Sequence, residues 1–201
     1  MGRFKVKKQD TFIDMTPMSD VMVLLLTFFM LTATFVKEEP VKVNTPGSVS
    51  EVKIPTSNLL TIFIEKNGKI FMNLDNPNAM TLTAQQVNTD QNADVVKDIA
   101  EFSKVPMFGT PLNQVNAWLA LDDRNGYLAK NPAAGIPCDS LNNELAVWVQ
   151  AARTAVGQDM RIAIKADQAT SYKVIKNVMN TMRKIDESRY NLLTSLKGVD
   201  K

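Results

Sequence analysis

The sequence predicts an α+β protein with a single N-terminal transmembrane helix, an extended linker and a small α/β domain with a mixed sheet and two main helices. Three features of the 201 residues favour this class. Residues 21–36 contain no charge, residues 37–58 contain three prolines, and the remainder alternates strand-like and helical patterns. The expected parts are an N-terminal segment over 1–16, a transmembrane helix over 17–36, a linker over 37–58 and a domain over 59–201.

The start of the span follows from its length. Sixteen residues, 21–36, rise about 24 Å as a helix, which is less than the roughly 30 Å of a bilayer core. Pro17 suits the first helical position, where its missing N–H costs nothing, and Thr16 can serve as the N-cap. From Pro17 to Val36 the helix reaches about 30 Å. This length places Asp20 inside the span.

The apolar stretch has two readings, a cleaved secretory signal or an uncleaved anchor. No A-x-A-like cleavage site follows it, and an acid stands at its beginning, so we expect an anchor. Three basic residues follow the span within about 20 residues, whereas four precede it. The four are Arg3, Lys5, Lys7 and Lys8. This asymmetry predicts a cytoplasmic N-terminus, with the remaining 165 residues across the membrane.

The chain after the span begins with a linker and a hairpin. Residues 37–58 contain Pro40, Pro46 and Pro55 among small polar residues, which is typical of an extended segment. Two strand-like runs, 59–65 and 69–74, flank the turn sequence Lys66-Asn67-Gly68. This pattern predicts a β-hairpin.

The C-terminal part predicts the other elements of the domain. Residues 160–166 alternate apolar and polar side chains, as in a half-buried strand. Apolar residues at helical spacing over 141–156 and 172–185 give the two main helices. A last strand is expected over 190–196.

Residues 75–143 are the least legible part, with weak helical patterns near 94–104 and 112–121. We interpret them as an insertion in the domain that adjusts contact with a partner. Their eight acids and four bases give −4, whereas residues 144–201 carry ten bases and six acids, giving +4. The two halves can attract each other, or one of them can recruit a charged partner.

Composition excludes several classes of function. The chain has no histidine and one cysteine, so it lacks the residues of zinc sites, Ser-His-Asp triads and Cys-His pairs. A formal net charge of +2 leaves no basic footprint for nucleic acid. Cys138 has no partner for an internal disulfide. We therefore expect no enzyme, no metal, no cofactor and no nucleic acid.

Asp20 is the residue on which the function depends. A carboxylate within a bilayer costs about 2.5–3.5 kcal/mol on insertion scales, so its presence calls for a compensating role. Residues seven apart return to nearly the same face of a helix, so four polar residues form one seam: Thr16, Asp20, Thr27 and Thr34. Such a seam favours contact with a multispanning partner. Two interpretations of Asp20 stay open: it is a proton carrier, or it is an acid near the interface that interacts favourably with the positive end of the helix dipole.

Three blocks of sequence carry a resemblance to a known family. Residues 13–25 (IDMTPMSDVMVLL) resemble the membrane signature of the ExbD/TolR family, which reads approximately NVTPFIDVMLVLL. Residues 41–46 (VKVNTP) are similar to its linker segment VKVNLP, and residues 161–182 are similar to its C-terminal strand and helix. The resemblance covers roughly residues 10–74 and 144–197.

The resemblance implies a single-pass subunit of the bacterial inner membrane that couples proton motive force to outer-membrane transport. It implies a homodimer inside a pentamer of an ExbB-like multispanning protein, surrounded by membrane lipid, that drives a TonB-like energy-transducing protein. The family's proton-carrying aspartate falls on Asp20, and its small α/β dimerisation domain is periplasmic. The linker contacts with the driven partner fall on Val41, Val43, Asn44 and Pro46.

This chain departs from the family pattern at Met18, Ser19 and Thr45, and in about 70 additional residues from Asp75. The driven partner can therefore be TonB-like, TolA-like or a gliding-type component. Asp167 matches a family position beside the last helix, where capping polarity and a binding role are both compatible with the sequence. The alternative from another class is a membrane-tethered periplasmic module that binds the cell wall, with peptidoglycan as its ligand and Asp20 incidental.

Overall fold

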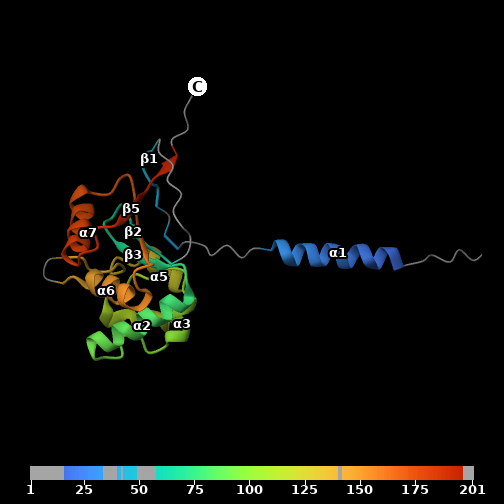
Figure 1. The fold of residues 1–201 in the computed structure, drawn as a ribbon, viewed down its shortest axis with the longest axis horizontal. Coiled ribbons are helices and arrows are strands. Elements are labelled where there is room, and N and C mark those ends of the chain that lie inside the picture. The colour runs from blue at the N-terminus through green and yellow to red at the C-terminus, as the bar shows by residue number, and fades with distance from the viewer. Residues whose placement is uncertain (1–15, 34–39, 42, 49–57, 140–141, 197–201) are drawn as a thin grey trace, which may run out of the picture. The chain divides into compact units, whose positions relative to one another are not determined.

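The computed structural model describes residues 16–33, 40–41, 43–48, 58–139 and 142–196 (Figure 1). The chain divides into two compact units, Met1–Lys37 and Glu38–Lys201.

The first unit contains helix α1, Thr16–Thr32. It begins one residue before the expected Pro17 and ends before the expected Val36, because Ala33 is no longer helical. Residues 34–36 of the expected span lie outside the described residues. In the described ranges, no helix combines the length and the apolar character needed to cross a membrane.

The second unit is built on a mixed sheet, as expected. Strands β2 (Leu59–Ile64) and β3 (Ile70–Leu74) form an antiparallel hairpin. Strands β4 (Arg161–Ala166) and β5 (Tyr190–Leu193) extend the sheet in parallel, giving the order β3-β2-β4-β5. Gly68 closes the hairpin with a φ of 82°, a conformation that glycine adopts without strain.

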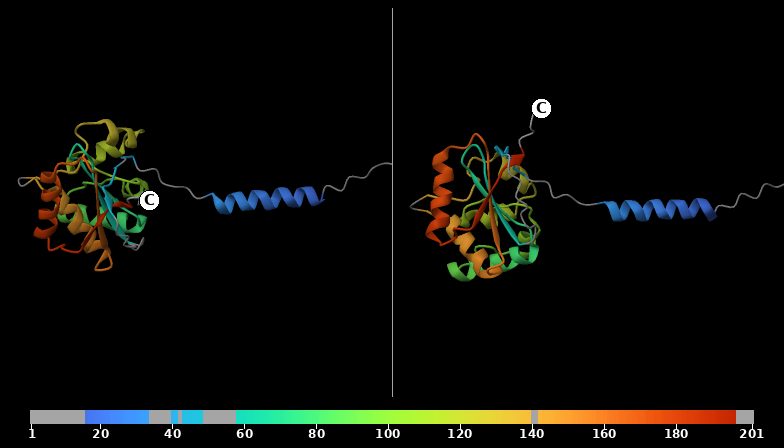
Figure 2. Two further views of the ribbon diagram at one scale, coloured as in Figure 1. Left: turned by 90° about the horizontal axis from the view of Figure 1, so that it is seen from above. Right: turned by 45° about the horizontal axis from the view of Figure 1, so that its top comes forward.

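The two expected helices are present as α6, Glu144–Val156, and α7, Tyr172–Lys184. Figure 2 shows α7 alongside the sheet in both views. Residues 75–143 form further helices besides these two. These are α2 (Pro77–Gln91), α3 (Ile99–Lys104), the 3₁₀ turn η1 (Leu112–Gln114), α4 (Val115–Leu119) and α5 (Arg124–Lys130). Those near 99–104 and 112–119 lie where the sequence shows weak helical patterns, and the others were not expected.

The additional segment shares its core with the rest of the domain. The rings of Phe102 and Phe108, both from residues 75–143, lie 5.7 Å and 4.7 Å from the ring of Trp148 in α6. All three side chains are buried, and helix α2 packs against α6. The segment is therefore part of the domain core.

The same segment covers the outer edge of β3. The N–H of Met72 donates to the carbonyl of Phe108 (2.8 Å), and the N–H of Phe108 donates back (2.9 Å). The N–H of Ile136 donates to the carbonyl of Ile70 (2.8 Å). An exposed strand edge is a template for unwanted pairing, so this cover protects the sheet on that side.

Candidate functional site

Helix α1 exposes apolar side chains around its whole circumference. Eleven large hydrophobic residues between Met18 and Leu31 are more than half exposed, from 51% for Leu25 to 84% for Leu31. Asp20 lies among them and is also exposed. A helix that is apolar all round is buried in its native setting, so α1 requires a covering of lipid or of other protein.

The described residues contain only part of the polar seam expected on α1. Asp20 and Thr27 are seven residues apart in a continuous helix and so share a face. The Thr27 hydroxyl donates to the carbonyls of Val23 and Leu24, both at 3.0 Å. Its hydrogen is therefore used within the helix, and its oxygen can still accept a hydrogen bond from outside. Thr16 is the first residue of the helix, and Thr34 lies outside the described residues.

The expected linker is docked on its own domain where the structure describes it. Val41 is buried in the core of the second unit, and Val43 packs against that core. Asn44 joins the turn between β4 and α7: its N–H donates to Asp167 Oδ2 (3.0 Å), and its carbonyl accepts from the N–H of Gln168 (2.8 Å). We call residues 41 and 43–48 the docked linker.

The docked linker ends in a short strand. Strand β1, Gly47–Ser48, pairs in parallel with β6, Ser195–Leu196. The expected last strand over 190–196 is thus divided, because β5 pairs with β4 whereas β6 leaves the sheet and pairs with the linker. This pairing brings residue 47 beside residue 195.

Asp167 organises the turn on which the linker rests. Its carboxylate accepts from the N–H of Ala169 (2.9 Å) as well as from the N–H of Asn44. These two backbone hydrogen bonds, from Ala169 first and then Asn44, hold the pKa of the Asp167 carboxyl below its ordinary value. For Asp167 the sequence was compatible with both a capping and a binding role. In the structure, Asp167 contacts the linker.

The residues expected to contact a driven partner therefore lie on the chain's own domain. Val41 is buried, Val43 and Pro46 are half-buried, and Asn44 is exposed. Their contact with another protein stays a prediction. In the part of the chain that the structure describes, no three His, Cys, Asp or Glu side chains gather as a metal site.

In comparisons with known proteins, a family model matches most of the chain, and two relatives each match about half of it. A family model described as "Biopolymer transport protein ExbD/TolR" matches residues 7–197. The chain is 29% identical over 91 residues to the "Biopolymer transport protein exbD2" of Vibrio cholerae serotype O1, a match covering 45% of this chain and 60% of that protein. It is 25% identical over 113 residues to the "Biopolymer transport protein ExbD" of Aquifex aeolicus, covering 51% of this chain and 86% of that protein. No solved structure matches the chain.

Proposed function

Because this chain belongs to the ExbD/TolR family of biopolymer transport proteins, we propose that it is an inner-membrane motor subunit that couples proton motive force to a TonB-type partner. Asp20 is the proton carrier. The N-terminus is cytoplasmic, α1 lies in the membrane and the α/β domain is periplasmic. The chain performs mechanical and transport work and is not an enzyme.

The observation that carries this proposal is one carboxylate on a helix that exposes apolar side chains all round. A charged carboxylate costs about 2.5–3.5 kcal/mol at membrane depth, whereas 100 mV supplies about 2.3 kcal/mol per elementary charge. The membrane potential alone therefore does not offset the cost of moving an ionised Asp20 through apolar surroundings. Neutral Asp20 passes apolar contacts, and ionised Asp20 faces water or hydroxyl groups of a partner.

The partners follow from the same helix. One helix cannot enclose a proton passage, so α1 needs a multispanning protein around it, an ExbB-like pentamer that holds a homodimer of this chain. The driven protein is TonB-like, with TolA-like and gliding-type proteins as alternatives within the family. Gentle detergent extraction from the native membrane should recover the chain with a multispanning protein in molar excess. Recovery of a stable monomer without that protein contradicts the motor assignment.

The decisive experiment is substitution of Asp20 in cells that express each variant at equal abundance. Asp20→Asn keeps the size and hydrogen bonding but releases no proton at neutral pH, so the complex should assemble and proton-motive-force-dependent uptake or motility should be abolished. A fully active Asn variant refutes the assignment of Asp20 as carrier.

A matched pair of threonine variants tests the seam. Thr27→Val removes a hydroxyl on the face of Asp20 and should reduce coupling. Thr32→Val is the control, because Thr32 lies about 120° from Asp20 around the helix. Its hydroxyl likewise donates within the helix, to the carbonyl of Phe28 at 2.8 Å. Equal loss of coupling in both variants contradicts a role for the seam.

A further inference from the structure

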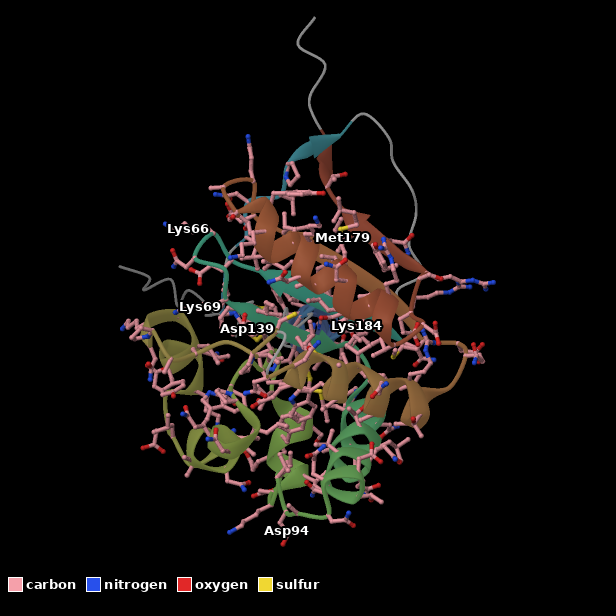
Figure 3. The ribbon with its side chains drawn as sticks, turned by 90° about the vertical axis from the view of Figure 1, so that its left-hand side faces the viewer. Lys66, Lys69, Asp94, Asp139, Met179 and Lys184 are labelled. Atoms are coloured by element: carbon pink, nitrogen blue, oxygen red, sulfur yellow. The ribbon has the colours of Figure 1, made fainter. Side chains whose placement is uncertain are left out.

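Two adjoining cavities form a polar groove along α7. Figure 3 views this face and labels three of the lining residues, Lys69, Asp139 and Lys184. One cavity of about 400 Å³ lies between α7 and the segment before α6, and a second of about 240 Å³ continues towards the β2–β3 hairpin. Both cavities are lined by Cys138, Asp139 and Asn177. One wall thus comes from the additional segment 75–143 and the other from α7.

The dimensions of the groove suit an extended chain. Its α7 wall runs from Val174 to Lys184, and ten residues of helical rise correspond to about 15 Å. A strand rises about 3.3 Å per residue, so this length accommodates about five residues of extended peptide.

The groove presents amide groups that the fold does not use. Asn177 and Asn180 are neighbours three residues apart on α7, and within the described residues neither side chain forms a hydrogen bond. Each carboxamide donates and accepts, which matches the N–H and C=O groups of a peptide backbone. By contrast, Asn143 is engaged in the fold, since it donates to Thr181 Oγ1 (2.9 Å) and caps α6.

The charges along the groove favour an acidic ligand. Arg183 and Lys184 line one end. Lys69 lines the hairpin end, where its ammonium donates one hydrogen bond to the carbonyl of Asn131 (2.8 Å) and has two N–H groups left for a ligand. Asp139 is the acid that lines both cavities, and it forms no ion pair among the described residues. Helix α7 carries four bases and no acid, so its surface attracts negative charge.

We propose that this groove binds an extended acidic segment of a partner protein, with its backbone against Asn177 and Asn180 and its carboxylates at the two basic ends. The additional segment 75–143 builds one wall of the groove, so this chain acquires a peptide site through that segment. The proposal does not depend on Asp20.

The test measures peptide binding to the full-length chain in lipid nanodiscs at low salt. The probe is a fluorescein-labelled pentapeptide, Glu-Ala-Ala-Ala-Glu, blocked at both ends, and the comparison peptide carries Lys in place of both Glu residues. We expect saturable polarisation with the acidic peptide and at least tenfold weaker binding of the Lys peptide. Absence of saturable binding, or equal binding of both peptides, overturns the proposal.

Two variants locate the site. Lys184→Glu should weaken binding of the acidic peptide at least tenfold. The control, Lys97→Glu, makes the same charge change at an exposed lysine that does not line the groove. It should change binding less than twofold. Asn177→Ala removes amide pairing without changing charge and should weaken binding about threefold. Equal effects of the two charge variants overturn the site.

A second readout is independent of charge. Cys138 is the single cysteine of the sequence and lines both cavities. Burial raises the pKa of its thiol, so its alkylation is slow and is compared with and without peptide at one fixed pH. Bound peptide should slow alkylation of Cys138 by N-ethylmaleimide at least threefold, and an unchanged rate at saturating peptide overturns the assignment. A peptidoglycan fragment that protects Cys138 where the acidic peptide does not also overturns it.

Discussion

At the residue scale, one exposed carboxylate joins segments that are far apart in the sequence. Asp167 and Asn44 are separated by 123 positions, and their hydrogen bond fixes the docked linker beside the start of α7. No local pattern in the sequence reveals such a contact, because each residue alone fits an ordinary loop.

Removing that carboxylate should release the linker. In Asp167→Ala, the N–H groups of Asn44 and Ala169 lose their acceptor, so we expect hydrogen exchange at the Asn44 amide to accelerate at least tenfold. Asp159→Ala, at an exposed acid in the turn at the opposite end of β4, is the control and should leave that amide unchanged. Unchanged exchange in Asp167→Ala means that the linker is held by its other contacts.

The same contact should depend on pH. Hydrogen bonding lowers the pKa of Asp167 from its ordinary 3.8, so the ionised form is favoured while the linker is docked. The contribution of ionised Asp167 to linker docking is complete above pH 3.8 and is lost as the pH falls through the lowered pKa. Amide chemical shifts of Asn44 should therefore be constant from pH 7 to about 5 and change below the ordinary pKa. A transition near neutral pH contradicts this assignment.

At the element scale, α6 is held to the additional segment by an aromatic cluster with one unsatisfied polar atom. The Trp148 ring is buried and stacks on Phe102, yet its Nε1–H has no hydrogen-bond partner in the described part of the chain. A buried unpaired donor costs about 1–3 kcal/mol.

Two substitutions of Trp148 should therefore differ widely. Trp148→Phe loses ring volume but also removes the unpaired donor, so we expect unfolding free energy to fall by less than about 1.5 kcal/mol. Trp148→Ala leaves a large cavity and should cost about 3–5 kcal/mol. Chemical denaturation of both variants measures the difference, and equal losses contradict this account of Trp148.

The sequence predicts some elements better than others. Strands over 59–65, 69–74 and 160–166 and the helix over 172–185 agree with β2, β3, β4 and α7 to within one residue at each end. These elements could be predicted because their apolar residues recur with the period of a strand or a helix. Helix α2 was missed because it is rich in Thr, Asn and Gln and buries few apolar residues, although Asn76-Pro77 is a sequence signal for a helix start.

Of the candidate sites, likewise, one could be predicted from the sequence and the others could not. Asp20 was predictable because one acid in an apolar run stands out in the sequence alone. The groove along α7 was not predictable, because Asp139 and Asn177 come from segments that only the tertiary fold brings together. The docked linker was missed for the same reason.

At the scale of the whole molecule, we expect the domain to depend on residues 75–143. They supply Phe102 and Phe108 to the core and cover the edge of β3. Replacing them with a short Gly/Ser connection should expose that edge and the Trp148 ring, and cause aggregation and loss of cooperative unfolding. Size-exclusion chromatography and thermal unfolding test this, and a monomeric domain with a sharp transition contradicts it.

The docked linker also determines how the molecule responds to tension. Val41 and Asn44 precede β2 along the chain, so a pull arriving from α1 reaches the hydrogen bonds of Asn44 before it reaches the four-stranded sheet. A hydrogen bond contributes about 0.5–1.5 kcal/mol net, whereas a whole domain is stable by about 5–15 kcal/mol. Because the docked linker has only the contacts of Val41, Val43, Asn44 and β1 to hold it, we expect it to yield before the sheet, and each residue that it frees adds at most about 3.3–3.6 Å of slack. We expect the molecule to lengthen under load while its sheet stays closed.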